Sequence, residues 1–240
     1  MKKQLSEVWM YGDPENFDLK HALAKKHKVN FENIVVGEGI DGLLGYLVRL
    51  IIEKRDNVVT TDGAYPTFNY HVEGFGGNLH KVPFCNDTED LQKLLDKVKE
   101  TSAKILYVSN PNNPMGTINK PSDVQTLIQN LPDTTLLCLD EAYIDFVDDN
   151  FVPKISLDTK NVIRMRTFSK AYGMAGLRVG YAIGEKNLIL NFEKIRNHFG
   201  MSRISQVGAL AALEDYDFIS DVINKVKLSR NRNGEIANNN

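Results

Sequence analysis

One short segment of the chain combines a lysine with residues that bind anions. Residues 167–180 read TFSKAYGMAGLRVG, so Lys170 comes shortly after an apolar run and Arg178 follows eight residues later. A lysine attacks an aldehyde when its pKa is lowered or when its Schiff base is stabilised. Ser169 and Arg178 add the hydroxyl and guanidinium donors that suit a phosphate. Taken alone, Ser169 and Lys170 could be a solvated loop pair, but the patterns elsewhere in the chain favour a nucleophilic lysine.

A carboxylate and a phenol follow a second apolar run. Residues 136–143 read LLCLDEAY, which puts Asp140 at the end of the run and Tyr143 three residues later. Parallel sheets place ligands at such strand ends. An aspartate that faces a pyridine nitrogen keeps it protonated, and a pyridinium is an electron sink. A helix N-cap is the alternative role for Asp140. The presence of Lys170 favours the chemical role.

An asparagine-rich turn precedes both features, between the predicted strand 105–109 and the next predicted helix. Residues 110–116 read NPNNPMG, a turn stiffened by two prolines and relaxed by one glycine. Such a turn holds an amide rigidly, so Asn113 could donate to a phenolate oxygen while Tyr143 donates from the other side. Because Asn-Pro pairs are common in plain turns, this run is weak by itself.

A glycine-containing turn near the start of the chain predicts an anion site. Residues 37–42 read GEGIDG between a predicted strand and a predicted helix, so backbone N–H groups and the positive end of the helix face the turn. The glycine spacing differs from GxGxxG, which disfavours a dinucleotide and leaves the phosphate of a smaller cofactor.

An aromatic run, Tyr65-Pro66-Thr67-Phe68, follows another predicted strand. It presents a ring that could stack on a planar heterocycle. Packing in the core is an equally good use of the same ring.

The elements that must position these residues alternate between strands and helices. Short β-branched or apolar runs predict strands, and apolar residues at helical spacing predict helices between most of them, which is typical of an α/β fold with a mostly parallel sheet. The predicted strands are residues 34–36, 57–61, 79–83, 105–109, 135–139, 162–166 and 179–183. The predicted helices are residues 19–27, 43–53, 91–100, 124–129, 204–213 and about 218–230, and residues 234–240 are expected to be disordered.

Composition excludes several classes of partner. The 240 residues carry 29 basic and 31 acidic side chains, and a net charge of -2 predicts no binding to nucleic acid or to an anionic membrane surface. No apolar stretch approaches the roughly 20 residues of a spanning helix, and we expect a cytoplasmic location. The two cysteines, without CxxC spacing, predict neither a disulfide framework nor a zinc site.

Three motifs in this order carry a resemblance to a known family. Asn-Pro-Asn-Asn-Pro-x-Gly, Asp-Glu-Ala-Tyr and Ser-Lys-x7-Arg resemble fold-type I aminotransferases, and most closely the histidinol-phosphate aminotransferase family. The resemblance runs from Tyr-Gly-Asp-Pro at 11–14 to residues 206–213. It implies a mixed, mostly parallel sheet flanked by helices, the cofactor pyridoxal 5'-phosphate, and amino transfer between an amino acid and an oxo acid or oxo phosphate ester.

The resemblance also implies a role for each matched position. Lys170 would form the Schiff base and later move the substrate's α-proton, and Asp140 would pair with the pyridine nitrogen. Asn113 and Tyr143 would hold the ring's oxygen, and Phe68 would stack on the ring. The remaining implied contacts are to the phosphate: Ser169, Arg178, the backbone at Ile40 and Asp41, and Tyr11 reaching across the interface of a homodimer.

The same resemblance divides the chain into domains. Residues 1–213 would form the large cofactor-binding domain, with a short N-terminal segment, and residues 214–240 would begin a small C-terminal domain. The family's arginine for the substrate carboxylate lies in that small domain, beyond the end of this sequence, so we interpret the sequence as a fragment.

Some positions depart from the family's pattern. Met115 replaces a threonine and Gly12 replaces a proline. Arg203 stands where the family tends to be polar and uncharged. It could meet an acidic or phosphorylated substrate, or it could be a surface arginine at the start of a helix.

Two alternative functions stay open from the sequence. A decarboxylase of the threonine-phosphate type shares these motifs and differs in which α-carbon bond is held perpendicular to the cofactor plane. A module that binds the cofactor without catalysis is the other alternative, because the carboxylate-binding arginine is missing.

Overall fold

The apolar runs form one seven-stranded sheet in the computed structural model, which describes residues 2–238. Its strand order is β1-β7-β6-β5-β4-β2-β3, and every neighbouring pair is parallel except those of β7, which runs antiparallel to both β1 and β6. The predicted α/β class and the mixed, mostly parallel sheet are confirmed. The strands are β1 (Ile34–Gly37), β2 (Asn57–Thr61), β3 (Asn78–Val82), β4 (Ile105–Ser109), β5 (Leu136–Asp140), β6 (Val162–Thr167) and β7 (Gly180–Gly184).

All seven predicted strands occur within one residue of their expected ends. The predicted helices also occur, and two short ones that we did not predict, α3 and α6, join them. The α-helices are α1 (Phe17–His27), α2 (Gly39–Ile51), α3 (Thr67–Gly74), α4 (Leu91–Thr101), α5 (Pro121–Asn130), α6 (Lys186–Glu193), α7 (Arg203–Glu214) and α8 (Tyr216–Asn238). Five 3-10 helices are η1 (Lys2–Glu7), η2 (Phe31–Asn33), η3 (Ile144–Phe146), η4 (Asp149–Phe151) and η5 (Ala175–Leu177).

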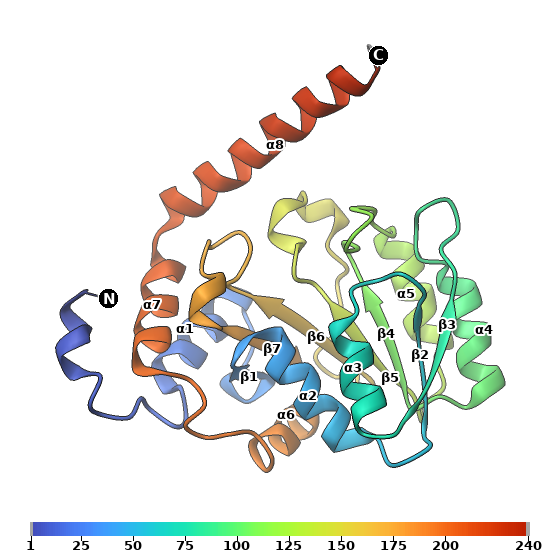
Figure 1. The fold of residues 1–240 in the computed structure, drawn as a ribbon, viewed down its shortest axis with the longest axis horizontal. Coiled ribbons are helices and arrows are strands. Elements are labelled where there is room, and N and C mark those ends of the chain that lie inside the picture. Colours follow the sequence, from blue (N-terminus) through green and yellow to red (C-terminus); the bar gives the residue numbers. More distant parts are fainter. Residues whose placement is uncertain (1, 239–240) are drawn as a thin grey trace.

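Helices cover both faces of the sheet (Figure 1). On one face α2, α3 and α6 pack on a cluster that includes Ile105 and Tyr107, and on the other α4 and α5 pack on one that includes Leu106 and Val108. Because successive side chains of β4 point to opposite faces, a strand buried on both sides must be apolar throughout. This explains why the central strands are continuous apolar runs. Helices α1 and α7 form a third cluster with β1 and β7.

The reversal of β7 places a loop at the carboxyl end of β6. Thr167 pairs with Gly180, so residues 168–179 leave the sheet and return to it at neighbouring positions. Lys170 and Arg178 both lie in this loop. Two neighbouring strands therefore fix both of its ends, which limits how far the lysine and the arginine can separate.

The C-terminal helix leaves the body of the molecule. Figure 1 shows α8, in red, extending away from the sheet, and most of its residues are exposed. The expected disorder of residues 234–240 is wrong for residues 234–238, which continue this helix. Asn239 and Asn240 lie outside the described residues.

Two further findings concern the described chain as a whole. No helix within residues 2–238 is long and apolar enough to cross a bilayer, and these residues contain no cluster of side chains suited to a metal ion. Cys138 is buried in β5, whereas Cys85 is exposed.

Candidate functional site

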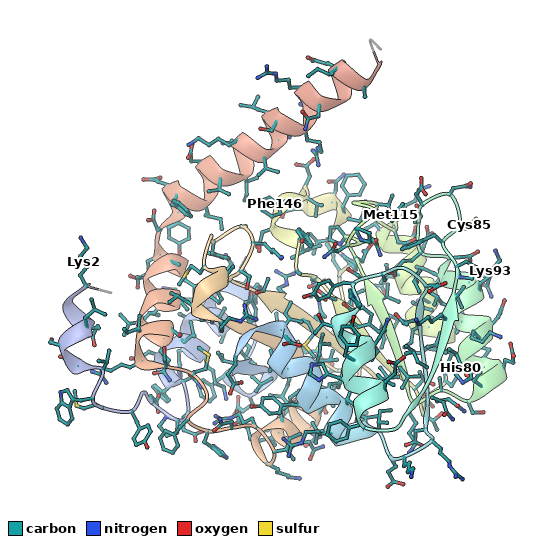
Figure 2. The ribbon with its side chains drawn as sticks, viewed as in Figure 1. Lys2, His80, Cys85, Lys93, Met115 and Phe146 are labelled. Atoms are coloured by element: carbon teal, nitrogen blue, oxygen red, sulfur yellow. The ribbon has the colours of Figure 1, made fainter. Side chains whose placement is uncertain are left out.

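A cavity of about 160 Å³ opens at the carboxyl ends of β4, β5 and β6. In open α/β sheets this is the end at which ligands bind. In Figure 2, Met115 from the loop after β4 and Phe146 from the segment after β5 both lie at this end of the sheet. Eight of the ten residues singled out from the sequence line the cavity: Ile40, Asp41, Asn113, Asp140, Tyr143, Ser169, Lys170 and Arg178.

Asp140 is the buried carboxyl group of the cavity, with 4% of the residue exposed. Tyr107 donates its hydroxyl to Oδ2 at 2.6 Å, and the Ala142 N–H donates to Oδ1 at 2.9 Å. Burial raises the pKa of Asp140, while the hydrogen bonds from Tyr107 and Ala142 act to lower it. These donors fix the plane of the carboxyl group. Its role is not that of an N-cap, because the next helix, η3, begins at Ile144 and has Tyr143 at its cap position.

Lys170 lies beside the ring of Tyr143 in the lining of the cavity. Its Nζ is 5.1 Å from the centre of the Tyr143 ring, and Lys170 is also among the charges that lower the pKa of Asp140. The loop is turned tightly behind it, because Gly173 donates its N–H to the carbonyl of Lys170 at 2.9 Å with a φ of 65°. The lysine is exposed, so its amine is accessible to a small molecule.

Ser169, Arg178 and the start of α2 form a donor-rich part of the cavity. Arg178 donates from Nη1 to the Ala175 carbonyl at 2.9 Å and to Ser169 Oγ at 3.4 Å. A Cβ on Gly39 would lie 2.5 Å from Arg178 Nη2, so a side chain at this position would force the guanidinium to shift. The first backbone N–H groups of α2 have no partner inside the helix. Together these groups suit a doubly charged phosphate.

The Asp41 side chain points to a different partner. Its carboxylate lies 2.8 Å from Nε2 of His71 in α3. The carboxylate therefore does not compete with an anion at this end, which leaves the backbone N–H of Asp41 for binding.

Asn113 reaches the cavity from the turn after β4. Its neighbour Asn112 is buried and holds the turn closed, because the Asn112 N–H donates to the Thr117 carbonyl at 2.8 Å and its Oδ1 accepts from the Met115 N–H at 3.1 Å. Asn110 is also buried and accepts from the Asn119 N–H at 2.8 Å. The turn is thus an ordered support for Asn113, in agreement with the rigidity predicted from its prolines.

Phe68 packs in the core and is not among the residues that line the cavity, so its stacking on a ligand stays a prediction. Phe68 has no exposed surface and stacks on Tyr107, with ring centres 4.6 Å apart and an angle of 12° between the rings. It stands at the second position of α3, whose first turn directs it into the core. The aromatic residue of this run that lines the cavity is Tyr65, which is 42% exposed.

Tyr11 and Arg203 lie away from the cavity. Tyr11 is 79% exposed, and its ring centre is 4.9 Å from that of Phe199. Arg203 begins α7 and pairs with Glu7 at 2.7 Å, with a further hydrogen bond to Gln4 at 3.1 Å. The structure therefore favours the reading of Arg203 as an arginine at the start of a helix.

Sequence reasoning missed several residues at this site. Tyr65, Ser109 and Thr167 line the cavity, and Tyr107 binds Asp140 from below it. Tyr107 could have been found from the alternation of side chains along a strand. Tyr107 and Ser109 are two residues apart and share one face of β4, and Ser109 pairs with Asp140.

Comparisons with known proteins agree with this geometry. The family model described as aminotransferase class I and II matches residues 3–236. A histidinol-phosphate aminotransferase from Desulfotalea psychrophila is 34% identical over 230 residues, which are 93% of this chain and 60% of that protein. This chain therefore spans less than two thirds of the length of that relative.

Two solved structures extend the comparison. The crystal structure of histidinol-phosphate aminotransferase from Sinorhizobium meliloti in complex with pyridoxal-5'-phosphate has 50% identity and a TM-score of 0.96, covering 99% of this chain and 65% of that one. L-threonine-O-3-phosphate decarboxylase from Porphyromonas gingivalis has 19% identity and a TM-score of 0.79, covering 90% and 67%, and shows a shared fold alone. The sheet is that of the fold-type I enzymes, and the chain belongs to the aminotransferase class I and II family.

Proposed function

We propose that the chain is the cofactor-binding part of a pyridoxal 5'-phosphate-dependent aminotransferase of the histidinol-phosphate aminotransferase type. The observation that carries the proposal is the cavity itself, which brings a buried carboxyl, an accessible lysine and a phosphate-type donor set together. The solved relative with 50% identity was crystallised with this cofactor.

The residues present fit that cofactor. Asp140 offers a buried carboxylate for the pyridine nitrogen, and Ser169, Arg178 and the N–H groups of Ile40 and Asp41 offer donors for the phosphate. Asn113 and Tyr143 line the same cavity and offer two donors for the ring oxygen, and Tyr65 offers an aromatic surface. The cofactor, when bound, supplies an electron sink for a carbanion at the substrate's α-carbon.

The protein's own groups divide the remaining work. Lys170 Nζ would hold the cofactor's aldehyde end and would move the proton at the substrate's α-carbon, as a general base and afterwards as a general acid. Asp140, fixed by Tyr107 and Ala142, keeps the proton on the pyridine nitrogen. Arg178 and Ser169 hold the phosphate, so the reacting atoms stay beside Lys170.

Amino transfer is the reaction we propose, from a donor such as glutamate to an oxo acid or an oxo phosphate ester. Its support is the 50% identity to a histidinol-phosphate aminotransferase. The likeness to a decarboxylase concerns the fold alone. No feature of the cavity favours decarboxylation over amino transfer.

We further propose a homodimer in which Tyr11 reaches the phosphate in the partner's cavity. Tyr11 lies outside its own cavity and is exposed next to Phe199, and Leu5, Val8 and Trp9 are exposed beside it in the sequence. An apolar group of this kind on a surface is typical of a protein interface. The domain division at Leu213 is part of the same proposal, supported by the exposure of α8. The cytoplasmic location stays a prediction from the sequence.

Absorbance spectroscopy tests the cofactor proposal. Purified protein mixed with pyridoxal 5'-phosphate should develop a visible band that Lys170→Ala abolishes and that Lys186→Ala, a change at an exposed lysine, leaves intact. L-glutamate should then convert the band to the spectrum of the pyridoxamine form. A band that ignores glutamate would limit the function to cofactor binding, and the absence of any band would refute the proposal for this chain.

A further inference from the structure

A second buried carboxyl group lies behind the cavity. Glu89 precedes α4 and is 2% exposed. Its Oε1 accepts from Asn112 Nδ2 at 2.7 Å and from the Ser109 N–H at 3.4 Å. Its Oε2 is buried and has no hydrogen-bond partner within residues 2–238. A buried carboxyl with one satisfied oxygen and one bare oxygen calls for an explanation.

Glu89 contacts both sides of the turn that carries Asn113. Ser109 ends β4 and lines the cavity, while Asn112 directly precedes Asn113 and binds the Met115 N–H. The Glu89 side chain therefore ties the end of the strand to the middle of the turn. Loss of this tie frees the turn to move relative to Asp140, because Ser109 pairs with Asp140 in the sheet.

The surroundings of Glu89 favour its neutral form. The nearby groups that interact with its charge are Asp140 on β5 and Tyr107 on β4, and neither is a cation. On α4, Lys93 pairs with Asp90 at 3.0 Å instead, and the other titratable residues around the adjoining cavity are Cys85 and Asp123. An ionised carboxylate with a bare oxygen in such a place is costly. Burial raises the pKa of Glu89 to about 8, and the charge of Asp140 adds to this increase. The hydrogen bonds from Ser109 and Asn112 act in the opposite direction and lower the pKa.

We propose that Glu89 is a positioning residue which, as a neutral acid held by Ser109 and Asn112, fixes the Ser109-to-Asn113 turn against the cavity. The positioning role rests on the function proposed above. The protonation state does not, because it is a property of the protein without any cofactor.

Thermal melting of the cofactor-free protein tests the protonation state. A raised pKa means that the folded protein holds this proton more tightly than the unfolded chain does. The contribution to stability is complete below the ordinary pKa of 4.5 and is lost as the pH rises toward about 8. Glu89→Gln has no proton to lose at this position. The melting temperature of the variant minus that of the unaltered protein should therefore increase by about 5 °C or more from pH 5 to pH 8.

The matched control is Asp90→Asn at the neighbouring position. Asp90 caps α4 by accepting from the Lys93 N–H, and its pKa is lowered. The difference in melting temperature between Asp90→Asn and the unaltered protein should therefore stay constant over the same pH range. If the difference in melting temperature between Glu89→Gln and the unaltered protein also stays constant from pH 5 to pH 8, the proposal that Glu89 is protonated is overturned.

Cofactor titration tests the positioning role. At pH 7 Glu89→Gln should bind pyridoxal 5'-phosphate within about twofold of the unaltered protein, because an amide replaces a neutral acid with little change of shape. Glu89→Ala and Asn112→Ala should each weaken binding by about tenfold, and the double variant by little more than either, because both remove one contact. Tight binding by both single alanine variants would overturn the role.

The two measurements separate the two proposals. If the unaltered protein does not bind the cofactor, both the proposed function and the positioning role are refuted. The melting curves still show whether Glu89 is protonated in the folded protein. If Glu89→Ala fails to fold, the positioning role is tested by the cofactor affinities of Asn112→Ala, which should be weakened, and of Glu89→Gln, which should be nearly unchanged.

Discussion

Tyr107 controls how easily Asp140 carries its charge. The phenol lies wholly within the core, yet its hydroxyl reaches Asp140 Oδ2 at 2.6 Å. This contact opposes the effect of burial on the pKa of Asp140. A carboxylate that must stay charged in an apolar core depends on such donors.

Tyr107→Phe should therefore weaken cofactor binding. A hydrogen bond to a charged group contributes about 1.5–3 kcal/mol, so the dissociation constant of pyridoxal 5'-phosphate should rise by roughly tenfold or more. The pKa of Asp140 should also rise, since a group that lowers it is gone, and the pH below which binding weakens should move upward. Absorbance titrations over a pH series check both effects. Tyr70→Phe, at an exposed tyrosine, is the control, and an equal loss in both variants would contradict this role.

Single residues were predictable where a motif ends a strand. Lys170, Asp140 and Asn113 were placed on one cavity because the carboxyl ends of parallel strands meet at one edge of a sheet. Phe68 and Tyr65 could not be told apart in the same way. Which of two nearby aromatic rings faces the cavity depends on the turn of α3, and the sequence of that short helix does not reveal its rotation.

The start of α2 is the element on which the phosphate end depends. Gly39 has a φ of 83°, and a Cβ on Gly180 would lie 2.6 Å from the Gly39 backbone. The helix, the start of β7 and Arg178 thus approach within contact distance at one point. Glycine at both positions is what permits this approach.

Gly39→Ala should distort this end of the cavity. A left-handed backbone costs an alanine roughly 1–2 kcal/mol, and the new Cβ would displace the Arg178 guanidinium. We expect a fall of roughly 2–8 °C in melting temperature and a clear loss of affinity for inorganic phosphate. Gly74→Ala, whose added Cβ meets nothing within 4 Å, should leave phosphate binding unchanged. Calorimetric titration with phosphate decides between them, and unaltered affinity in Gly39→Ala would argue against the site.

Elements were predictable where their pattern is long or wholly apolar. The seven strands were found because burial on both faces makes them continuous apolar runs. Helices α3 and α6 were missed because eight residues give too few turns to establish a helical period. The end of α8 was misjudged because its polar residues resemble a disordered tail, whereas the helix continues to Asn238.

Shared sites are the consequence of the proposed dimer for the whole molecule. Lys170→Ala and Tyr11→Ala each damage every site of their own dimers. In a mixed dimer, the Tyr11→Ala subunit keeps Lys170 and receives Tyr11 from its partner, so one site is complete. Mixing the two inactive variants should restore about a quarter of the sites. The absorbance band and its response to glutamate measure the recovery.

A mixture that recovers nothing, although sedimentation shows that mixed dimers have formed, would rule out the shared site. A monomer in sedimentation would rule out the dimer itself. Phe17→Ala serves as the control for Tyr11→Ala, because Phe17 is another exposed aromatic residue but packs against His21 and Phe31 instead.

The strand order has a consequence for how a newly synthesised chain acquires its site. Among the described strands, β1 comes first in the chain and pairs with β7, which comes last, so β1 stays without its sheet neighbour until Gly184 has been made. Ile40 and Asp41 lie three and four residues after the end of β1, and Arg178 lies two residues before the start of β7. The pairing of β1 with β7 is therefore the same event that brings the two halves of the phosphate end together.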